Sequence, residues 1–327
     1  IDWEGLDRLV DFQIQNGITG ILAVGTTGES PVLTWEEHNQ ITERIARKAA
    51  GKCLCIAGTG SNNTSETLEG TRHAAQCGCQ AVLLVDPYYN GPSSLEIRRE
   101  YVAPVAKAFP GLDIIPYVIP GRTGTQLLPE DLALLFKRYP NVNTVKEATA
   151  DIQNMRRTRA CCGPDFTILS GDDGMTLAVM ADPAVKAAGV ISVASNVAPR
   201  AITEMVTLLN AGRQSEAEAL AAKLEPLFNL VTVKTVEKTP YGEVACRARN
   251  PVAYKTLMAI LGMPAGPCKP PLGKLTRNGL TRVLETARSV QRSAPELFQP
   301  VADAFGVNIA KRLEDPQCWE GLCYTEY

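Results

Sequence analysis

The sequence is poor in histidine, has no long apolar run and carries no excess of basic charge. Its 327 residues include only His38 and His73, and the formal net charge is -2 at pH 7. No stretch reaches the roughly 18 uninterrupted apolar residues that a membrane span requires. Because no basic field is present to attract nucleic acid or an anionic membrane, we expect a small-molecule partner.

Two further absences concern targeting and metals. The first residues, Ile1 to Glu4, have neither the basic region nor the apolar core of a signal peptide, so we expect a cytoplasmic protein. The ten cysteines include no C-x2-C pair and histidine support is scarce, so we expect no metal site. Cys55 and Cys79 lie in or beside apolar runs, where reduced cysteine behaves as a small hydrophobe.

Short β-rich apolar runs recur along the first two thirds of the chain, with helical patterns between them. Their centres lie about 23 to 33 residues apart, the length of a strand–loop–helix–loop unit, which predicts an α/β fold with a parallel sheet. The seven predicted strands are 20–25, 53–58, 81–86, 113–119, 142–147, 166–171 and 189–194. The periodicity does not distinguish a closed barrel from an open doubly wound sheet.

Helix signals surround these strands and dominate the rest of the chain. Residues 1–17 have an amphipathic pattern, Thr34 and Ser93 each begin a capping box, and Pro129 suits a first helical turn. After Asn196 the chain is helical, with a polar interruption at 232–249. The predicted helices there are 199–210, 215–230, 251–261, 277–292 and 295–305. We expect a barrel or sheet domain over 1–215, a C-terminal helical domain over 216–293 and a tail over 294–327.

Lys146 is the most informative residue of the predicted strands. It lies at the end of the 142–147 run, where an unpaired buried ammonium group is costly or loses its proton. A neutral lysine amine attacks the carbonyl carbon of a small keto acid and forms a Schiff base. The alternative is an ordinary strand-end lysine whose head reaches water.

Other polar residues follow the strands that come before Lys146. The turn Gly25-Thr26-Thr27-Gly28 offers hydroxyl and N–H groups for a carboxylate, and no Gly-Lys-Ser/Thr follows it as in a phosphate loop. Tyr88 and Tyr89 follow the third strand, Tyr117 lies near the end of the fourth, and Arg122 follows the fourth. Each alone is an ordinary turn, packing tyrosine or surface arginine. Together they occupy the same end of successive strands, where tyrosines transfer protons and arginine binds carboxylate.

These motifs in order resemble those of a known family. The sequence contains G-T-T-G-E-S, D-P-Y-Y-N-G-P-S, Y-x-x-P-G-R-T-G, V-K-E-A-T, L-S-G-D-D and G-V-I-S-V. Over roughly residues 1–292 it is similar to the dihydrodipicolinate synthase / N-acetylneuraminate lyase family of class I aldolase-type enzymes. The resemblance implies a (β/α)8 TIM barrel with a C-terminal helical appendage, whose first strand is not in this sequence. No cofactor is implied.

The resemblance assigns roles residue by residue. It implies that Lys146 forms the Schiff base with pyruvate, that Tyr117 protonates and deprotonates the adduct, and that Thr26 and Tyr89 complete the proton relay. A neighbouring subunit lends the tyrosine at position 89 in this family, and a homotetramer built as a dimer of dimers is implied. The residues matching the pyruvate pocket are Thr26, Thr27, Gly171 and Ile191.

Arg122 is the best discriminator of the second substrate. In the synthase branch, an arginine before the Thr-Gly pair receives the carboxylate of L-aspartate 4-semialdehyde. The implied reaction condenses this aldehyde with pyruvate to give 4-hydroxy-tetrahydrodipicolinate, a step toward diaminopimelate and lysine. Two alternatives stay open: a pyruvate aldolase for a 2-keto-3-deoxy sugar acid or N-acetylneuraminate, and a non-catalytic sensor of a keto acid or lysine.

A regulatory site is also implied by the resemblance. Six residues fall where lysine-inhibited synthases bind free lysine at a subunit interface, and the alternative is ordinary polarity at helix starts. They are Ser30, Trp35, His38, Asn62, Glu66 and Tyr88.

Four features depart from the family pattern. Val118 stands where asparagine usually follows the catalytic tyrosine, and Pro116 removes a strand N–H just before it. The segment 232–249 and the tail after Ala294 are additional. We expect a displaced Tyr117 to reduce the rate, and a loop inserted near the site to alter the aldehyde preference.

Overall fold

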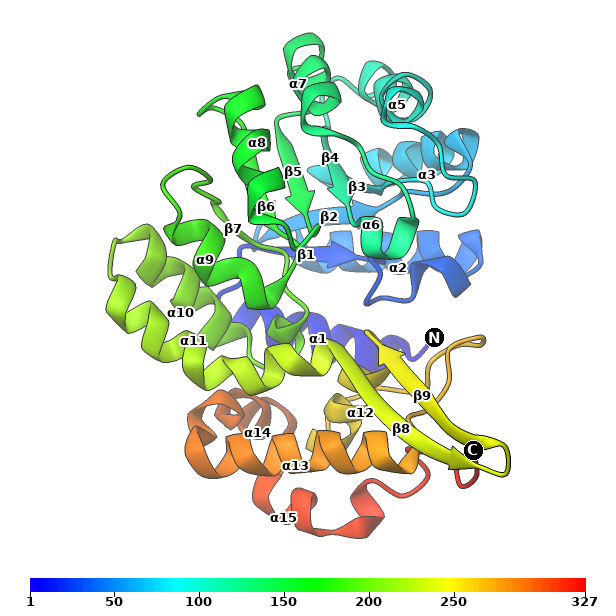
Figure 1. The fold of residues 1–327 in the computed structure, drawn as a ribbon, viewed down its shortest axis with the longest axis vertical. Helices are drawn as coiled ribbons and strands as arrows, with labels where there is room; N and C mark the ends of the chain where they lie inside the picture. The colour runs from blue at the N-terminus through cyan, green and yellow to red at the C-terminus, as the bar shows by residue number, and fades with distance from the viewer.

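A computed structural model describes residues 1–327 and contains a seven-stranded parallel sheet (Figure 1). The strands follow one another in sequence order from β1 to β7, so a doubly wound sheet, in which the order reverses, is excluded. They are β1 (Gly20–Ala23), β2 (Leu54–Gly58), β3 (Ala81–Val85), β4 (Asp113–Val118), β5 (Thr144–Glu147), β6 (Thr167–Ser170) and β7 (Gly189–Val190). All seven predicted strands are confirmed, each somewhat shorter than its apolar run.

Helices connect the strands and cover one face of the sheet. Parallel neighbours require crossover connections, and a constant crossover hand with a constant strand order places every helix on the same side. Figure 1 shows the strand direction turning between β1 and β5, so the sheet curls. The helices of this part are α1 (Trp3–Gln15), α2 (Trp35–Ala49), α3 (Thr64–Gln76), α4 (Ser94–Glu96), α5 (Ala103–Ala108), α6 (Pro120–Thr123), α7 (Pro129–Arg138), α8 (Ile152–Cys162) and α9 (Thr176–Ala181).

The helix starts follow the capping chemistry that the sequence predicts. At α2, Thr34 Oγ1 accepts a hydrogen bond from the Glu37 N–H at 3.2 Å, and the Glu37 carboxylate accepts one from the Thr34 N–H at 3.0 Å. Ser93 and Glu96 form the same capping box at α4. Pro129 is the first residue of α7. These caps satisfy N–H groups that have no partner within the helix.

Alternation along the strands creates two apolar layers. Val82, Leu84 and Val145 belong to an outer core between the sheet and its helices. A smaller inner cluster lies on the opposite face and consists of Ala81, Leu83, Ile115 and Tyr117. Because successive side chains of a strand point to opposite faces, Lys146 lies on the inner face, next to the outward-facing Val145.

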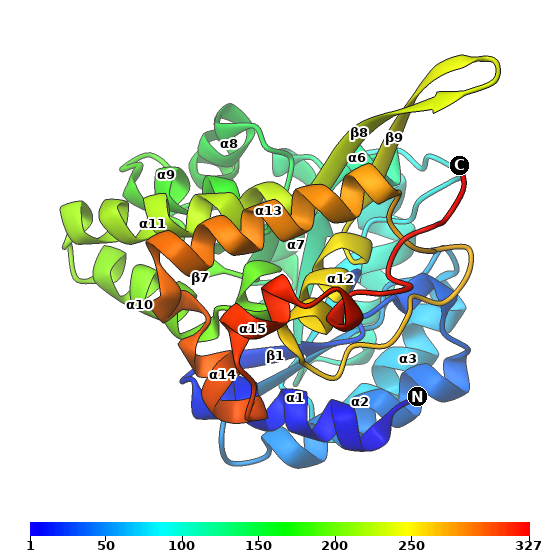
Figure 2. The same ribbon diagram turned by 90° about the horizontal axis from the view of Figure 1, so that it is seen from below.

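The helices after β7 share a third core. It extends from Ala194 to Leu313 and includes Phe12 of α1. Figures 1 and 2 show α13 and α15 stacked below α10 and α11. The helices are α10 (Pro199–Asn210), α11 (Gln214–Phe228), α12 (Val252–Leu261), α13 (Arg277–Ser293), α14 (Gln299–Phe305) and α15 (Ile309–Glu314). The predicted helix 295–305 divides into a 3-10 turn, Pro295–Leu297, and α14.

The polar segment 232–249 is not a loop. It forms an antiparallel hairpin of β8 (Thr232–Thr239) and β9 (Gly242–Arg249), joined at Pro240 and Tyr241. Its alternating β-branched and charged residues are typical of a half-exposed strand, a pattern that the helical context on either side concealed. Both ribbon views show the turn of the hairpin projecting beyond the body (Figures 1 and 2).

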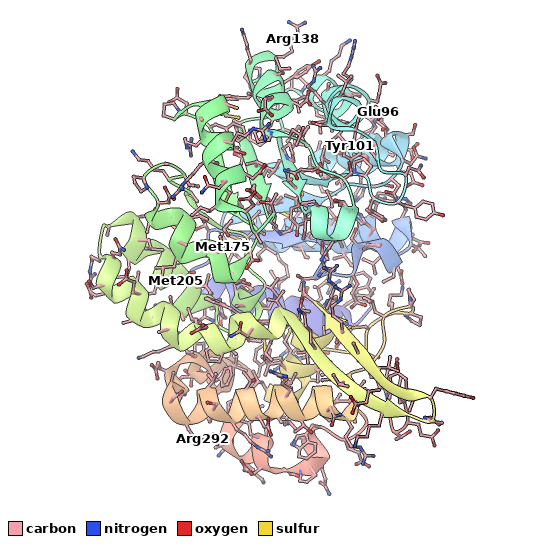
Figure 3. All side chains as sticks on the ribbon, viewed as in Figure 1. Glu96, Tyr101, Arg138, Met175, Met205 and Arg292 are labelled. Carbon is pink, nitrogen blue, oxygen red and sulfur yellow. The ribbon has the colours of Figure 1, made fainter.

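Side chains fill the space between these layers (Figure 3). Met205 of α10 is only 1% exposed, whereas Arg138 at the end of α7 lies at the edge of the molecule. None of the helices combines the length and apolar character needed to cross a membrane.

Candidate active site

Lys146 lies beside Tyr117 on the inner face of the sheet. The register of β4 and β5 pairs these two residues directly, so their side chains leave the sheet on the same side. Lys146 is 7% exposed, and its Nζ lies 4.1 Å from the centre of the Tyr117 ring. The lysine head therefore packs against an aromatic face and does not reach bulk water.

The surroundings of Lys146 favour its neutral form. Burial lowers its pKa from the ordinary value near 10.5 to about 8, while the charge of Asp173 raises it and that of Arg122 lowers it. Roughly one amine in ten is then neutral at pH 7, far more than for an exposed lysine. A nucleophilic amine is thus available near neutral pH.

Tyr117 stays protonated in this environment. Burial raises its pKa to about 12, although Arg122 and Thr26 act in the opposite direction. Its side chain is only 5% exposed. The tyrosine therefore keeps an O–H group that can donate or accept a hydrogen bond.

The Thr26–Thr27 loop follows β1 and has a strained backbone. Val24 has a φ of 47°, a conformation that a β-branched residue rarely adopts. Gly58 permits this bend, because a Cβ there would lie 2.6 Å from the Val24 carbonyl oxygen. Thr26 lines a cavity described below, and Thr27 Oγ1 accepts a hydrogen bond from Asn250 Nδ2 at 2.8 Å.

Arg122 belongs to α6, the short helix after β4. Its Nη2 donates to the Asn250 carbonyl oxygen at 3.1 Å, and the side chain lines the cavity that contains Tyr117. Burial lowers its pKa, as do Arg249 and Arg247, whereas Tyr117 raises it. No salt bridge neutralises this arginine, so its charge is available to an anionic ligand.

Gly171 and Ile191 lie at the ends of the next two strands. A Cβ on Gly171 would approach Lys146 Cε to 3.2 Å and Ala148 Cβ to 2.8 Å, so only glycine leaves the lysine stem free. Ile191 packs against the inner apolar cluster. Gly171 therefore borders the Lys146 side chain, and Ile191 borders the inner apolar cluster.

Tyr89 is the one predicted catalytic residue that the structure does not bring to this group. Its side chain is 94% exposed, and its φ is 84°. A tyrosine at positive φ is a backbone outlier, and such outliers concentrate at functional positions. Within one chain it is presented to solvent.

Two residues of the site were missed by sequence reasoning. Asp173 is 4% exposed, and its Oδ2 accepts hydrogen bonds from the Val193 N–H at 2.9 Å and the Ala194 N–H at 3.0 Å. The L-S-G-D-D motif contained this signal. Asn250 contacts both the Thr27 and Arg122 loops, but it lies more than 120 residues away and no local pattern indicated this.

A cavity of about 550 Å³ is lined by three of the predicted catalytic and substrate-binding residues and by the regulatory candidates, whereas Lys146 is not among its lining residues. Thr26, Tyr117 and Arg122 line one part of it. The six residues predicted to bind lysine all line the same cavity: Ser30, Trp35, His38, Asn62, Glu66 and Tyr88. These six residues come from five different loops and helices and converge on one space.

The regulatory candidates are held by specific contacts. The His38 Nε2 lies 2.7 Å from the Gly58 carbonyl oxygen, and the two rings of Trp35 and His38 lie 4.8 Å apart. Burial lowers the pKa of His38 and raises that of Tyr88. Nδ1 of His38 is buried without a partner and is a free acceptor in its neutral form.

The two local departures from the family pattern lie in β4, whose pairing with β3 and β5 includes Tyr117. Val118 is 1% exposed and belongs to the outer core, so it points away from the cavity. β4 continues through Pro116, which pairs in register with Leu84. An apolar residue fits position 118 because that face of the strand is buried against helices.

The fold and the site together define a class: α/β proteins that hold a buried lysine of lowered pKa at the carboxyl end of a parallel sheet. The sequence matches the Dihydrodipicolinate synthetase family over residues 1–289. The chain belongs to this family.

Relatives support this assignment over most of their length. The chain is 37% identical to a 4-hydroxy-tetrahydrodipicolinate synthase of Methanococcus maripaludis strain S2, covering 85% of this chain and 89% of the relative. It is 38% identical to the enzyme of the same name from Methanococcus aeolicus, covering 88% and 92%.

Solved structures agree. The 4-hydroxy-tetrahydrodipicolinate synthase of Methylacidiphilum fumariolicum SolV superposes with a TM-score of 0.82 at 34% identity, covering 92% of this chain and 94% of the other. The Cyanidioschyzon merolae enzyme, solved with lysine bound, gives 0.79 at 32% identity, with 88% and 92% covered. A monomeric dihydrodipicolinate synthase variant gives 0.78 at 30%, with 88% and 91% covered.

Proposed function

We propose that this chain is a lyase that condenses pyruvate with L-aspartate 4-semialdehyde to 4-hydroxy-tetrahydrodipicolinate. The observation that carries the proposal is the direct pairing of Tyr117 and Lys146 across β4 and β5, with the Lys146 amine buried at a pKa of about 8. Relatives of this name share 35–38% identity with the chain. The activity belongs to the biosynthesis of diaminopimelate and lysine, and we place it in the cytoplasm.

The chemistry follows from a neutral amine next to a proton donor. Lys146 Nζ attacks C2 of pyruvate, and the carbonyl oxygen leaves as water once it has been protonated. Loss of a proton from C3 of the imine gives an enamine, whose C3 attacks the aldehyde carbon while the aldehyde oxygen takes up a proton. The substrate's amino group then attacks C2, closes the ring and releases the lysine amine.

The proton transfers fall to Tyr117. Its buried hydroxyl keeps its proton at neutral pH, and its ring lies beside the lysine. Thr26 and Tyr89 extend the relay toward solvent, Tyr89 from a neighbouring subunit. Proton transfer by a positioned group typically accelerates a step by about 10² to 10⁴.

The carboxylates of the two substrates are bound by different loops. Thr26 and Thr27 hold the carboxylate of pyruvate with their hydroxyl and N–H groups, and Gly171 and Ile191 border its methyl end. Arg122 binds the carboxylate of the aldehyde, because its unpaired guanidinium faces the same cavity.

Borohydride trapping and a product assay test this proposal. Pyruvate with borohydride should add a reduced three-carbon adduct at Lys146, detected by peptide mass spectrometry. Lys146→Met should abolish it, whereas Lys137→Met, on the exposed face of α7, should not. Turnover of L-aspartate 4-semialdehyde completes the test. Release of pyruvate from a 2-keto-3-deoxy sugar acid or N-acetylneuraminate without such turnover would identify another aldolase, and absence of any adduct a sensor.

We further propose that free L-lysine inhibits the enzyme from the far part of the cavity. Glu66 offers a carboxylate for an ammonium group. The related Cyanidioschyzon merolae enzyme has been solved with lysine bound. Turnover should fall at millimolar lysine, and Glu66→Gln should raise the concentration required by at least about tenfold. Unchanged turnover at these concentrations would rule out the site.

We propose that the seven strands belong to a (β/α)8 barrel with a C-terminal helical appendage, and that the enzyme works as a homotetramer. The sequential strand order and the inward row of side chains support the barrel. The outward Tyr89 supports the subunit partner. Since a monomeric variant of a relative is known, sedimentation analysis is the direct measurement.

A further inference from the structure

The β8–β9 hairpin has one basic face. In an antiparallel pair, residues directly opposite each other project on the same side. Thr232 is opposite Arg249 and Lys234 is opposite Arg247, so the three cations share a face. We call Lys234, Arg247 and Arg249 the basic face of the hairpin. The other face packs against the start of α13, where Asn278 donates to Glu237 at 2.8 Å.

The foot of the hairpin is bound to the candidate active site. Arg249 Nη2 donates to the Gly121 carbonyl oxygen at 3.1 Å, and Arg122 Nη2 donates in the opposite direction to Asn250 at the same distance. Asn250 in turn donates to Thr27. Both substrate-binding loops are therefore in hydrogen-bond contact with residues at the end of β9.

The charges at this contact are not compensated. The chain has eleven salt bridges, and none of them involves Arg122 or a residue of the basic face. Lys234 and Arg247 are like charges directly opposite each other, an arrangement that by itself destabilises a hairpin. Arg247 and Arg249 are also close enough to lower the pKa of Arg122. A bound anion would offset this repulsion.

We propose that the basic face of the hairpin, together with Arg122, is an entry site for small carboxylates that attracts the anionic substrates and passes them to the cavity. This inference rests on the proposed function. A row of one charge sign at the rim of a cleft raises the local concentration of oppositely charged ligands and their association rate. The additional segment of this chain thereby acts on substrate capture, while the chemistry at Lys146 is unchanged.

The test measures pyruvate capture in the intact protein. The second-order rate of borohydride trapping at limiting pyruvate should fall with increasing salt in the wild type. Arg247→Gln should lower this rate at low salt by about three- to tenfold and flatten the salt dependence. The trapping rate at saturating pyruvate should stay the same. Arg247 makes no side-chain hydrogen bond or salt bridge within the chain, so its replacement removes charge and little else.

Three controls make the result decisive. Lys238→Gln also removes one charge from the hairpin, but Lys238 is directly opposite Glu243 and nearer the turn. The Lys238→Gln variant should therefore show the same trapping rate and salt dependence as the wild type. Arg247→Lys should restore the salt dependence. Methyl pyruvate, which is uncharged, should be trapped at equal rates by the wild type and Arg247→Gln.

Other outcomes overturn the inference. Equal salt dependence in Arg247→Gln and the wild type, or equal losses in the Arg247 and Lys238 variants, would show that the basic face does not attract substrate. If the wild type forms no adduct with pyruvate, the proposed function itself fails. If the wild type forms the adduct and Arg247→Gln does not change the trapping rate, only the proposal of an entry site is rejected.

Discussion

At the scale of single residues, the site depends on what burial does to two ionisable groups. Lys146 and Tyr117 lie in the same register position of neighbouring strands, and burial shifts both pKa values toward the neutral forms. A neutral amine is a nucleophile and a neutral phenol is a proton donor. Burial therefore favours, in both groups, the neutral form that the proposed chemistry requires.

The hydroxyl of Tyr117 should matter for rate and little for binding. Tyr117→Phe keeps the ring that packs on Lys146 Nζ, so we expect kcat to fall by about 10² to 10⁴ with only a small change in the KM for pyruvate. Steady-state kinetics of product formation give both quantities. Tyr139→Phe, a partly buried tyrosine packed against the outer core, serves as the matched control. A Tyr117→Phe enzyme of normal kcat would exclude this residue from the relay.

The pH dependence of Schiff-base formation should report the pKa of Lys146. Because the neutral amine reacts, the trapping rate at limiting pyruvate should rise with pH through about 8 and then level off. Asp173 raises this pKa and Arg122 lowers it. Asp173→Asn should therefore move the profile to lower pH, and Arg122→Gln should move it to higher pH.

Shifts in the same direction for both variants would contradict this electrostatic account. The Asp173→Asn side chain keeps a carbonyl oxygen for the N–H groups of Val193 and Ala194, so the β7 loop retains an acceptor. Thermal denaturation of both variants checks that the fold is preserved.

At the scale of elements, helix α2 positions two of the residues that we propose to bind free L-lysine. Its capping box at Thr34 fixes the first turn, which carries Trp35 and His38. Gly70 of α3 admits the Trp35 ring, since a Cβ there would lie 2.9 Å from it. The cap and the glycine thus set one wall of the cavity.

Removing this cap should destabilise the chain modestly. Thr34→Ala should lower the free energy of unfolding by about 1 kcal/mol, because the Glu37 N–H loses its acceptor. Urea denaturation measures the change. Thr34→Ser retains the hydroxyl and should be close to the wild type. Equal losses in the two variants would show that the threonine methyl, and not the hydrogen bond, is responsible.

At the scale of the whole molecule, Tyr89 lies apart from the buried Lys146 within one chain. Tyr89 is exposed on a backbone outlier, while Lys146 is buried in the sheet. If a neighbouring subunit lends Tyr89, each active site combines residues of two chains.

Mixing two inactive variants tests this arrangement. Lys146→Met lacks the nucleophile and Tyr89→Phe lacks the lent hydroxyl, so each alone should be nearly inactive. In a mixed dimer, the site with an intact Lys146 receives an intact Tyr89. Co-expression should restore roughly a quarter of the wild-type activity by random pairing. No recovery in verified mixed oligomers would place Tyr89 outside the relay.

The relation between sequence and structure differs from element to element. The seven strands and the long helices were predictable, because a buried parallel strand requires an apolar run and a helix start requires a cap. The hairpin at 232–249 was not recognised, because its stability depends on pairing between two strands and on packing against α13.

By itself, the sequence determined the order of βα units, the family motifs and the prominence of Lys146, since these depend on local composition and spacing. Only the tertiary structure decided that Tyr117 and Lys146 share a register position, that Asn250 joins the Thr27 and Arg122 loops, and that Arg247 and Arg249 lie beside Arg122. Such contacts join residues up to 223 positions apart. They arise from strand pairing and chain crossing, which leave no periodic trace in the sequence.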